Sequence, residues 1–391
     1  MTSKTSLRPF IRFFIAYYFA IGAIAPFLSL YLQAQGFDGV QIGLIFGLTP
    51  IVSLLAQPWW GVTADAFAIR RRLLMLVLVI SGAISLVLPL AQGFVAVTLV
   101  LMALTLFRTP SLPIANAITL EALAPHRERY PQIRAWGSAS FAITSLLIGW
   151  LVIDRALVGA IYLSALGLFI AALISRLLPD GHAPIAARWW DGWTMTRHNR
   201  PFLLFLLAMV ALQFTHPLAV AYLPLYLKDI GAPGWVIGAA WGIAAGMEVP
   251  LMALTPRLIR RYGAKRVLVG FTAAVPLRWA LYSVITMPLL ILPLQFLHAM
   301  AATAYYAAAI TYVDGLVPAQ WRATGQGFYG ALSDSLGIGL GSLFFGWVYQ
   351  TWGITQAFIV GAGVALAGWL MLVALVRPRA APAGHQPPTT A

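Results

Sequence analysis

Long apolar runs alternate with short polar connections along almost the whole chain. Each run is about twenty residues or longer, which is the length a helix needs to cross the hydrocarbon core of a bilayer. The twelve runs are residues 10–33, 39–63, 73–92, 94–122, 133–153, 157–178, 201–227, 234–256, 267–286, 288–316, 324–350 and 354–376. The first run is too long for the core of a cleavable signal peptide, so it is predicted to be a retained span. The pattern therefore predicts an all-α polytopic membrane protein with twelve transmembrane helices.

The composition supports this class and excludes several others. Hydrophobic residues make up 61% of the chain and charged residues only 9%, which leaves too little polar surface for a soluble globular protein. There is no cysteine, so disulfides and thiolate metal sites are excluded. The sequence has no phosphate-binding loop, no G-x-S-x-G segment and no His-rich metal cluster. We therefore expect a protein that is not an enzyme and that needs neither a metal nor another cofactor.

The basic residues are distributed unevenly over the connections. The net charge is +14, and nearly all Lys and Arg lie near the termini and in the loops at 64–72, 123–132, 179–200, 257–266 and 317–323. The connections on the opposite side hold only Arg155 and Lys228. Basic loops stay in the cytoplasm, so the charge indicates orientation in a membrane and not nucleic-acid binding. We expect a monomer in the cell (inner or plasma) membrane with both termini cytoplasmic, whose partners are lipid, protons and a small-molecule substrate.

An internal repeat divides the chain into two halves. The segments FLSLYLQAQGFDGVQIG (27–43) and YLPLYLKDIGAPGWVIG (222–238) are identical at eight of seventeen positions without a gap. Each segment joins the first and second span of its half, which indicates two parallel six-helix repeats. The predicted organisation is an N-terminal bundle (1–178), a cytoplasmic linker (179–200), a C-terminal bundle (201–377) and a disordered tail (378–391).

The loop after the second span, GVTADAFAIRRR, resembles the loop motif of the major facilitator superfamily. Gly61, Asp65 and the Arg70–Arg72 run match its Gly, acidic and basic positions, whereas Ala66 and Ala68 depart from it. The chain resembles this superfamily over essentially its whole length. The resemblance implies two pseudo-symmetric six-helix bundles with a substrate site between them. It also implies a cytoplasmic gate made of Gly61, Asp65, Arg70, Arg71 and Arg72.

Within the superfamily, the chain is most similar to the phenylpropionate permeases and the lactose permease-like symporters. The segments that show this similarity are RTPSLPIANA (108–117), YPQIRAWGS (130–138), EVPLM (248–252), LRW (277–279) and LH (297–298). Lactose permease has Glu, Arg and His at the positions of Glu248, Arg278 and His298, so the resemblance implies a role for these residues in proton coupling. It also implies that His298 contacts substrate. Ala301 stands where that permease has a second carboxylate, so its usual proton acceptor has no counterpart.

Opposite charges near the middle of the eighth and ninth spans predict an ion pair. A lone arginine in the bilayer core costs on the order of 2.5–3.5 kcal/mol or more, so we expect Arg278 to pair with Glu248. Protonation of Glu248 would release the pair and couple transport to protons; a static clamp is the alternative. Asp334 on the eleventh span also has two interpretations. It forms a titrating pair with His216 on the seventh span, or it makes a hydrogen bond between packed helices.

The resemblance places a substrate-binding arginine at Arg134, and Asn116 stands where related proteins have an acid. Arg134 is then free to bind a carboxylate of the substrate; the alternative is a residue that reaches toward the membrane surface. Arg108 is either a second cation of the cavity or part of an ion pair with another span. Trp136 and Tyr305 complete the predicted substrate site with His298. Further rings that could stack on an aromatic substrate belong to Tyr17, Tyr18, Trp241 and Tyr306. Packing or interface anchoring is the alternative for the aromatic residues, and packing between helices is the alternative for His298.

These features predict a secondary active transporter that works by alternating access. The predicted cargo is a small polar or anionic organic solute, such as an aromatic acid, moved by proton-coupled symport. A sugar or nucleoside transporter, working by symport or efflux, is the alternative. A transport-inactive sensor or scaffold with a transporter fold is a third interpretation.

Overall fold

Prolines and glycines in the apolar runs break the spans into shorter helices that follow one another. The computed structural model describes residues 7–66, 69–124, 126, 129–153, 156–180, 199–318 and 321–375, and every regular element in these ranges is a helix. Ten helical segments in this part are long and apolar enough to cross a membrane. The fifth and ninth predicted spans are also helical and lie within the same bundles. The predicted all-α polytopic fold is therefore confirmed. Residues 181–198 of the predicted linker and the predicted tail 378–391 lie outside the described ranges.

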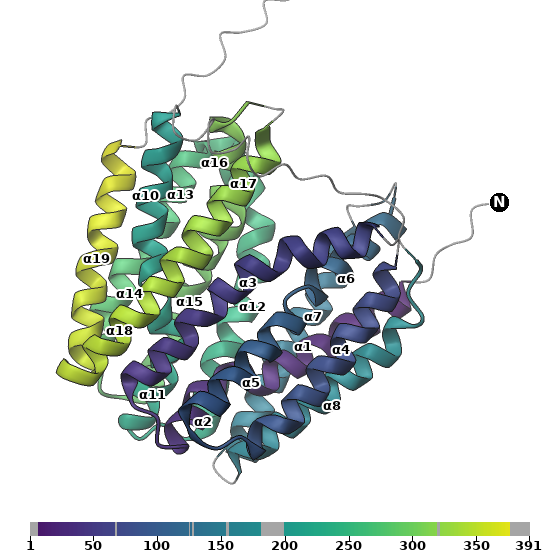
Figure 1. The fold of residues 1–391 in the computed structure, drawn as a ribbon. Coiled ribbons are helices and arrows are strands. Elements are labelled where there is room, and N and C mark those ends of the chain that lie inside the picture. Colours follow the sequence, from purple (N-terminus) through teal and green to yellow (C-terminus); the bar gives the residue numbers. More distant parts are fainter. Residues whose placement is uncertain are drawn as a thin grey trace, which may run out of the picture.

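The first half contributes helices that pack as one group (Figure 1). They are α1 (Arg8–Ile24), η1 (Ala25–Phe27), α2 (Leu28–Ala34), α3 (Gly39–Ala66), α4 (Arg70–Val87), η2 (Leu88–Leu90), α5 (Gly93–Arg108), α6 (Ser111–Ala122), α7 (Tyr130–Ile148), η4 (Gly149–Ile153) and α8 (Leu157–Ser175). Within this group α1 packs against α7 and α8, and α4 packs against α8.

The second half forms the other group. Its helices are α10 (Arg200–Phe214), η5 (Leu218–Tyr222), α11 (Leu223–Asp229), α12 (Gly234–Tyr262), α13 (Ala264–Thr272), α14 (Ala274–Tyr282), η6 (Pro288–Leu290), α15 (Ile291–Thr303), η7 (Ala304–Ala308), α16 (Ala309–Leu316), α17 (Arg322–Tyr329), η9 (Gly330–Gly337), α18 (Ile338–Trp352) and α19 (Ile354–Leu375). The elements η4, η5, η7 and η9 are π-helices, which are rare and occur often at functional sites.

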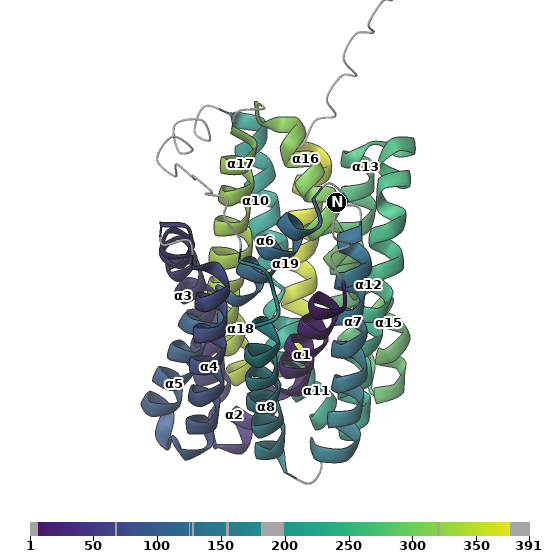
Figure 2. The same cartoon turned by 90° about the vertical axis from the view of Figure 1, so that its right-hand side faces the viewer.

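The molecule has two different ends. The start of α1 and the end of α19 lie at one end, together with the start of α4 and its three arginines (Figures 1 and 2). We call this the basic end and the other the closed end. The two groups of helices diverge toward the basic end in Figure 1. Their most extensive contacts are between α7 and α12 and between α3 and α18.

Small residues let the two groups approach each other closely at the closed end. A Cβ atom on Gly238 of α12 would collide with the carbonyl oxygen of Ser145 on α7. In the second pair, a Cβ on Gly43 of α3 would stand 2.6 Å from the Ser342 carbonyl oxygen, and one on Gly346 would stand 2.6 Å from the Gly39 carbonyl oxygen. Only residues without a side chain allow backbones to meet in this way. We call these two contacts together the seam.

Candidate functional site

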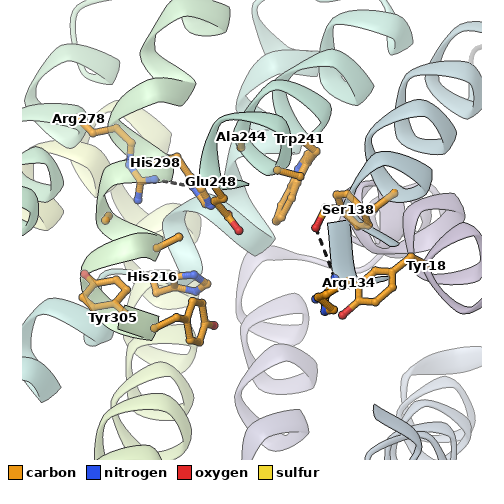
Figure 3. Close-up of a pocket in the computed structure, with 15 residues that line it drawn as sticks. Tyr18, Arg134, Ser138, His216, Trp241, Ala244, Glu248, Arg278, His298 and Tyr305 are labelled. Carbon is orange, nitrogen blue, oxygen red and sulfur yellow. Dashed lines mark hydrogen bonds between the residues drawn. The ribbon is translucent and has the colours of Figure 1, made fainter. Parts of the chain in front are cut away.

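A cavity of about 260 Å³ lies beside the seam, between the two groups of helices. Along α12 the seam residue Gly238 is followed by the lining residues Trp241, Ala245 and Glu248 on the side of the basic end. The first group contributes side chains from α1 and α7 to the wall. The second group contributes side chains from α12, α14, α15, η7 and the turn before η5. Figure 3 shows the two sets of side chains facing each other.

Arg134 provides the positive charge on the wall of the first group. It lies four residues before Ser138 and seven before Phe141, so all three project from one face of α7 into the cavity. Its guanidinium carbon lies 4.0 Å from the ring centroid of Tyr18, and Nη1 lies 3.4 Å from the Ser138 hydroxyl. In the described ranges no carboxylate lies within 4 Å of Arg134. Arg134 is therefore a cation that is held by a ring and a weak hydrogen bond, and its charge is available to a ligand.

Gly137 makes this arrangement of Arg134 possible. A Cβ at that position would stand 2.6 Å from Cδ2 of Tyr18 and 3.3 Å from Nη1 of Arg134. Local packing therefore explains the glycine of the Arg-x-aromatic-Gly segment, because it leaves room for the Tyr18 ring against which Arg134 stacks.

Glu248 is the acid of the cavity. It is partly buried, and the described part of the chain contains no hydrogen bond or ion pair to its carboxylate. The cation whose field reaches Glu248 is Arg134, on the other group of helices. Glu248 and Arg134 thus interact across the cavity without touching.

Trp241 lies two helical turns before Glu248, on the same face of α12, and also lines the cavity. Its ring packs edge-on against Phe141 of the first group and His298 of the second, with centroids 6.4 and 6.0 Å away. The indole Nε1 has no hydrogen-bond partner among the described residues. Trp241 therefore offers a flat surface to the cavity, while its N–H is buried without a partner in this part of the chain.

Arg278 is buried in the wall of the second group, with 2% of its surface exposed. Its Nη1 lies 2.6 Å from Nδ1 of His298, and its guanidinium carbon lies 4.0 Å from the ring centroid of Trp279. The predicted ion pair with Glu248 is not formed in the described structure, which corrects that expectation. The guanidinium instead donates to the imidazole of His298 and stacks on the indole of Trp279.

Asp334 makes a hydrogen bond between packed helices, the second of its two predicted roles, and does not pair with His216. Its Oδ1 accepts a hydrogen bond from Nε2 of Gln213 at 2.6 Å, and Asp334 is not part of the cavity wall. His216 does line the cavity, but its Nδ1 is buried without a partner in the described ranges. The predicted His216–Asp334 pair is therefore not formed, because the π-helix η9 presents Asp334 to Gln213 on α10.

The cavity wall contains some of the other predicted residues and excludes others. His298 and Tyr305 line it. Arg108 and Asn116 do not; Asn116 accepts a hydrogen bond from the Tyr130 hydroxyl at 2.9 Å, which uses its side-chain oxygen. Trp136 is 54% exposed and points away from the cavity, which corrects its assignment to the substrate site.

The structure also separates the aromatic candidates and adds a polar residue. Tyr18, Trp241 and Tyr306 line the cavity, whereas Tyr17 does not, and Ser138 lines it without having been predicted. The spacing of four and three residues between Trp241, Ala245 and Glu248 places Trp241 on the same helix face as Glu248.

The predicted gate lies at the basic end, outside the cavity. Arg70 is almost fully buried and lies 3.3 Å from the Glu121 carboxylate, while Arg71 lies 2.9 Å from the Asp180 carboxylate. Arg72 is exposed. At Gly61 and Asp65 the described part includes the backbone of α3 but not the side chains, so their predicted contacts lie outside it.

Comparisons with known proteins agree with this architecture. The model of the MFS_1 like family matches residues 10–360. The chain is 28% identical to a maltose permease of Geobacillus stearothermophilus over 93% of both chains. It is 26% identical to a probable 3-phenylpropionic acid transporter of Escherichia coli over 94% of this chain and 96% of that protein. The fold matches the crystal structure of the D323A mutant of the nucleoside transporter NupG with a TM-score of 0.87, at 18% identity and over 95% of this chain and 99% of that one.

Proposed function

Because the chain belongs to the MFS_1 like family and is a multi-pass membrane transporter of the major facilitator type, we propose that it carries a small organic anion together with a proton by alternating access. The observation that supports an anionic cargo most strongly is Arg134. A guanidinium that faces a cavity without a carboxylate partner is suited to bind an acidic group in bidentate fashion.

The aromatic walls favour a cargo with a flat apolar part. The rings of Tyr18 and Trp241 belong to opposite groups of helices and both face the cavity. A planar group between them would be covered on both sides, and offset or edge-on contacts between rings are favourable. An aromatic acid satisfies both Arg134 and this space.

Glu248 is the proposed proton carrier. It lies in the same cavity as Arg134, and a second carboxylate brought there by substrate would repel it. Two carboxylates that share a site cannot both be ionised at low cost, so binding of the anion favours protonation of Glu248. Uptake of one proton with each substrate is the expected result.

The orientation of the protein in the membrane follows from the distribution of its basic residues. Lys and Arg concentrate at the basic end, and such residues remain on the cytoplasmic side of a membrane. We infer a monomer in the inner or plasma membrane with both termini in the cytoplasm. With the seam closed and the groups diverging toward the basic end, the described conformation is one that faces the cytoplasm.

A sugar is the second candidate. The maltose permease is a relative over most of both chains, and Trp241 has an indole N–H that could donate to a hydroxyl group as well as a ring that could stack on a sugar. Glu248 and Arg134 would then bind hydroxyl groups. A transport-inactive sensor or scaffold is the third possibility that the experiment addresses.

Uptake into proteoliposomes under an imposed pH gradient, acid outside, tests these alternatives. The panel contains mono- and dicarboxylic aromatic acids, with 3-phenylpropanoate as the first, and maltose and uridine. We expect accumulation of an organic acid, and we expect Arg134→Gln to weaken its binding about tenfold to a hundredfold, the scale of a hydrogen bond to a charged group. Arg322→Gln, which removes an exposed cation at the start of α17, is the control and should leave binding unchanged.

Each other outcome selects an alternative. Accumulation of maltose or uridine, with no acid bound, would support the second candidate. No transport and no binding of any compound by a correctly folded protein would support the sensor or scaffold.

A further inference from the structure

A second positively charged group lies in the cavity wall, opposite Arg134. It consists of Arg278 on α14, His298 on α15 and His216 in the turn between α10 and η5, and we call it the Arg278 cluster. Figure 3 shows the cluster and Arg134 on opposite sides of the cavity. The proposed function uses Arg134 and Glu248 but gives the Arg278 cluster no task.

The hydrogen bonds of the cluster leave part of its hydrogen-bonding capacity unused. A guanidinium can only donate, so Nδ1 of His298 must accept the bond from Nη1 of Arg278, and the proton of the neutral imidazole is then on Nε2. Nε of Arg278 and Nδ1 of His216 are buried without a partner in the described ranges. A buried guanidinium with an unused donor matches a group that only accepts hydrogen bonds, and an ionised acid is such a group.

The cluster has no counter-ion of its own in the described part of the chain. Asp334 is hydrogen-bonded to Gln213, and no ion pair joins Glu248 to Arg278. A buried charge without an opposite charge is strongly unfavourable, so a ligand that supplies one gains much of its affinity there.

We propose that the substrate carries two acidic groups, one bound by Arg134 and the other by the Arg278 cluster, so that one molecule connects the two groups of helices. This inference rests on the proposed function and specifies its substrate class. Trp241 supports a flat spacer between the two acids, because its ring contacts His298 of the cluster and Phe141, which lies two turns from Arg134 on the same face of α7.

The charges of the cavity balance for such a substrate. The two arginines contribute two positive charges, and Glu248 contributes one negative charge when it is ionised. A dianion neutralises both arginines, and the site is neutral overall when Glu248 holds a proton. The diacid and the proton therefore favour each other's binding, as the proposed symport requires.

Binding of three matched compounds to the purified full-length protein tests the inference. The compounds are 3-phenylpropanoate, 3-(4-carboxyphenyl)propanoate and the methyl ester of the latter at its ring acid. We expect the wild type to bind the diacid about tenfold or more tightly than the other two, since the second acid gains a hydrogen bond to a charged group. Arg278→Gln should reduce this preference to about one while it leaves binding of 3-phenylpropanoate within about threefold.

Two further variants separate charge from shape. Arg278→Lys keeps the charge and should retain part of the preference for the diacid, whereas Arg322→Gln should retain all of it. Thermal unfolding establishes that each variant is folded. If Arg278→Gln does not fold, the comparison of the diacid with its half ester on the wild type decides the question.

The results that overturn this inference differ from those that overturn the proposed function. Equal affinity of the wild type for the diacid and its half ester refutes the second acidic group and leaves the proposed organic anion intact. A preference for the diacid that persists in Arg278→Gln also refutes the role of the Arg278 cluster and leaves the proposed organic anion intact. Failure of the wild type to bind any of the three acids, with maltose or uridine bound instead, refutes both.

Discussion

The seam and the cavity are neighbouring contact regions of the same two groups of helices, but they are built in opposite ways. In the seam, backbone meets backbone, and glycines such as Gly43, Gly238 and Gly346 leave no room for a methyl group. In the cavity, charged side chains of the two groups face each other without forming an ion pair, as Arg134 and Glu248 do. The seam is held by close packing, whereas the cavity keeps its charges unpaired.

This difference indicates a division of tasks. Close packing of backbones is lost at once when the helices separate, so the seam can act as an all-or-none contact between two conformations. Unpaired charges respond to a ligand or to a proton, so the cavity can set which conformation is favoured. We therefore expect substitutions in the cavity to change binding and coupling, and substitutions in the seam to change the population of conformers.

The largest effect is expected at Glu248. Glu248→Gln removes the proposed site of protonation but keeps the size of the side chain, so accumulation driven by a pH gradient should be abolished. Exchange of labelled for unlabelled substrate needs no net proton movement and should continue. Both are measured in proteoliposomes with the acid identified in the uptake panel.

Asp334→Asn is the matched control for Glu248. Asp334 is a second carboxylate in a membrane helix, but it lies outside the cavity wall and is hydrogen-bonded to Gln213. Accumulation by this variant should continue. If Asp334→Asn abolishes accumulation while Glu248→Gln retains it, the cavity does not contain the coupling carboxylate.

The next largest effect is expected at Gly238. In Gly238→Val the new side chain would collide with the backbone of Ser145 and Leu146, which cannot move aside as a flexible side chain can. The seam should open, and the closed conformation should become a minor one. Spin labels at Gln92→Cys and Met287→Cys lie on the two groups at the closed end. Opening of the seam should shift the distribution of distances between the labels to larger values. The chain has no native cysteine to interfere.

Gly246→Ala on the same helix tests whether the position matters. A Cβ at Gly246 would meet no atom within 4 Å, and alanine favours a helix over glycine by about 1 kcal/mol. The distance distribution of this variant should match that of the labelled wild type. A shift as large as that of Gly238→Val would show that α12 responds to any added methyl group and that the seam is not special.

The fold was predictable because the bilayer constrains it strongly. Buried backbone in lipid must be helical, so the length of each apolar run was enough to identify a span. The predicted boundaries differ from the observed ones mainly where polar residues extend a helix beyond the apolar core. The ninth span, for example, begins at Ala264 and α12 ends only at Tyr262, where Arg260 and Arg261 form the last turn.

The site was predictable in its residues but not in its pairings. Arg134, Glu248, Arg278 and His298 all line one cavity, as expected from their places in the spans. Trp136 could have been excluded, because a residue two positions from Arg134 lies on another face of the helix. The partners of Arg278 and Asp334 could not be derived, since the π-helices shift the helix faces and the separation of the halves depends on the conformation.

A smaller effect is expected at Gly137, where the cavity depends on a glycine as the seam does. In Gly137→Ala the Cβ would press on Tyr18, and the ring would displace Arg134 from its position. Substrate affinity should fall about three- to tenfold, the scale of a cation–π contact, although no charge has changed. Tyr18→Phe keeps the ring and should stay within about twofold of the wild type. Unchanged affinity in Gly137→Ala would mean that the position of Arg134 does not depend on Tyr18.

The smallest effect is expected at Lys228, which forms a polar contact between the two groups at the closed end. Its ammonium group donates a hydrogen bond to Oε1 of Gln33 at 3.1 Å; Lys228 is exposed and Gln33 is partly buried. Exposed polar contacts contribute little, so Lys228→Met should change the ratio of open to closed conformers by less than about 0.5 kcal/mol. The same spin-label pair at Gln92→Cys and Met287→Cys measures this ratio. Gln33→Leu and the double variant complete a double-mutant cycle, which gives the interaction energy of the Lys228–Gln33 contact. A shift comparable to that of Gly238→Val would mean that polar contacts at the surface, and not the close approach of backbones, keep the closed end shut.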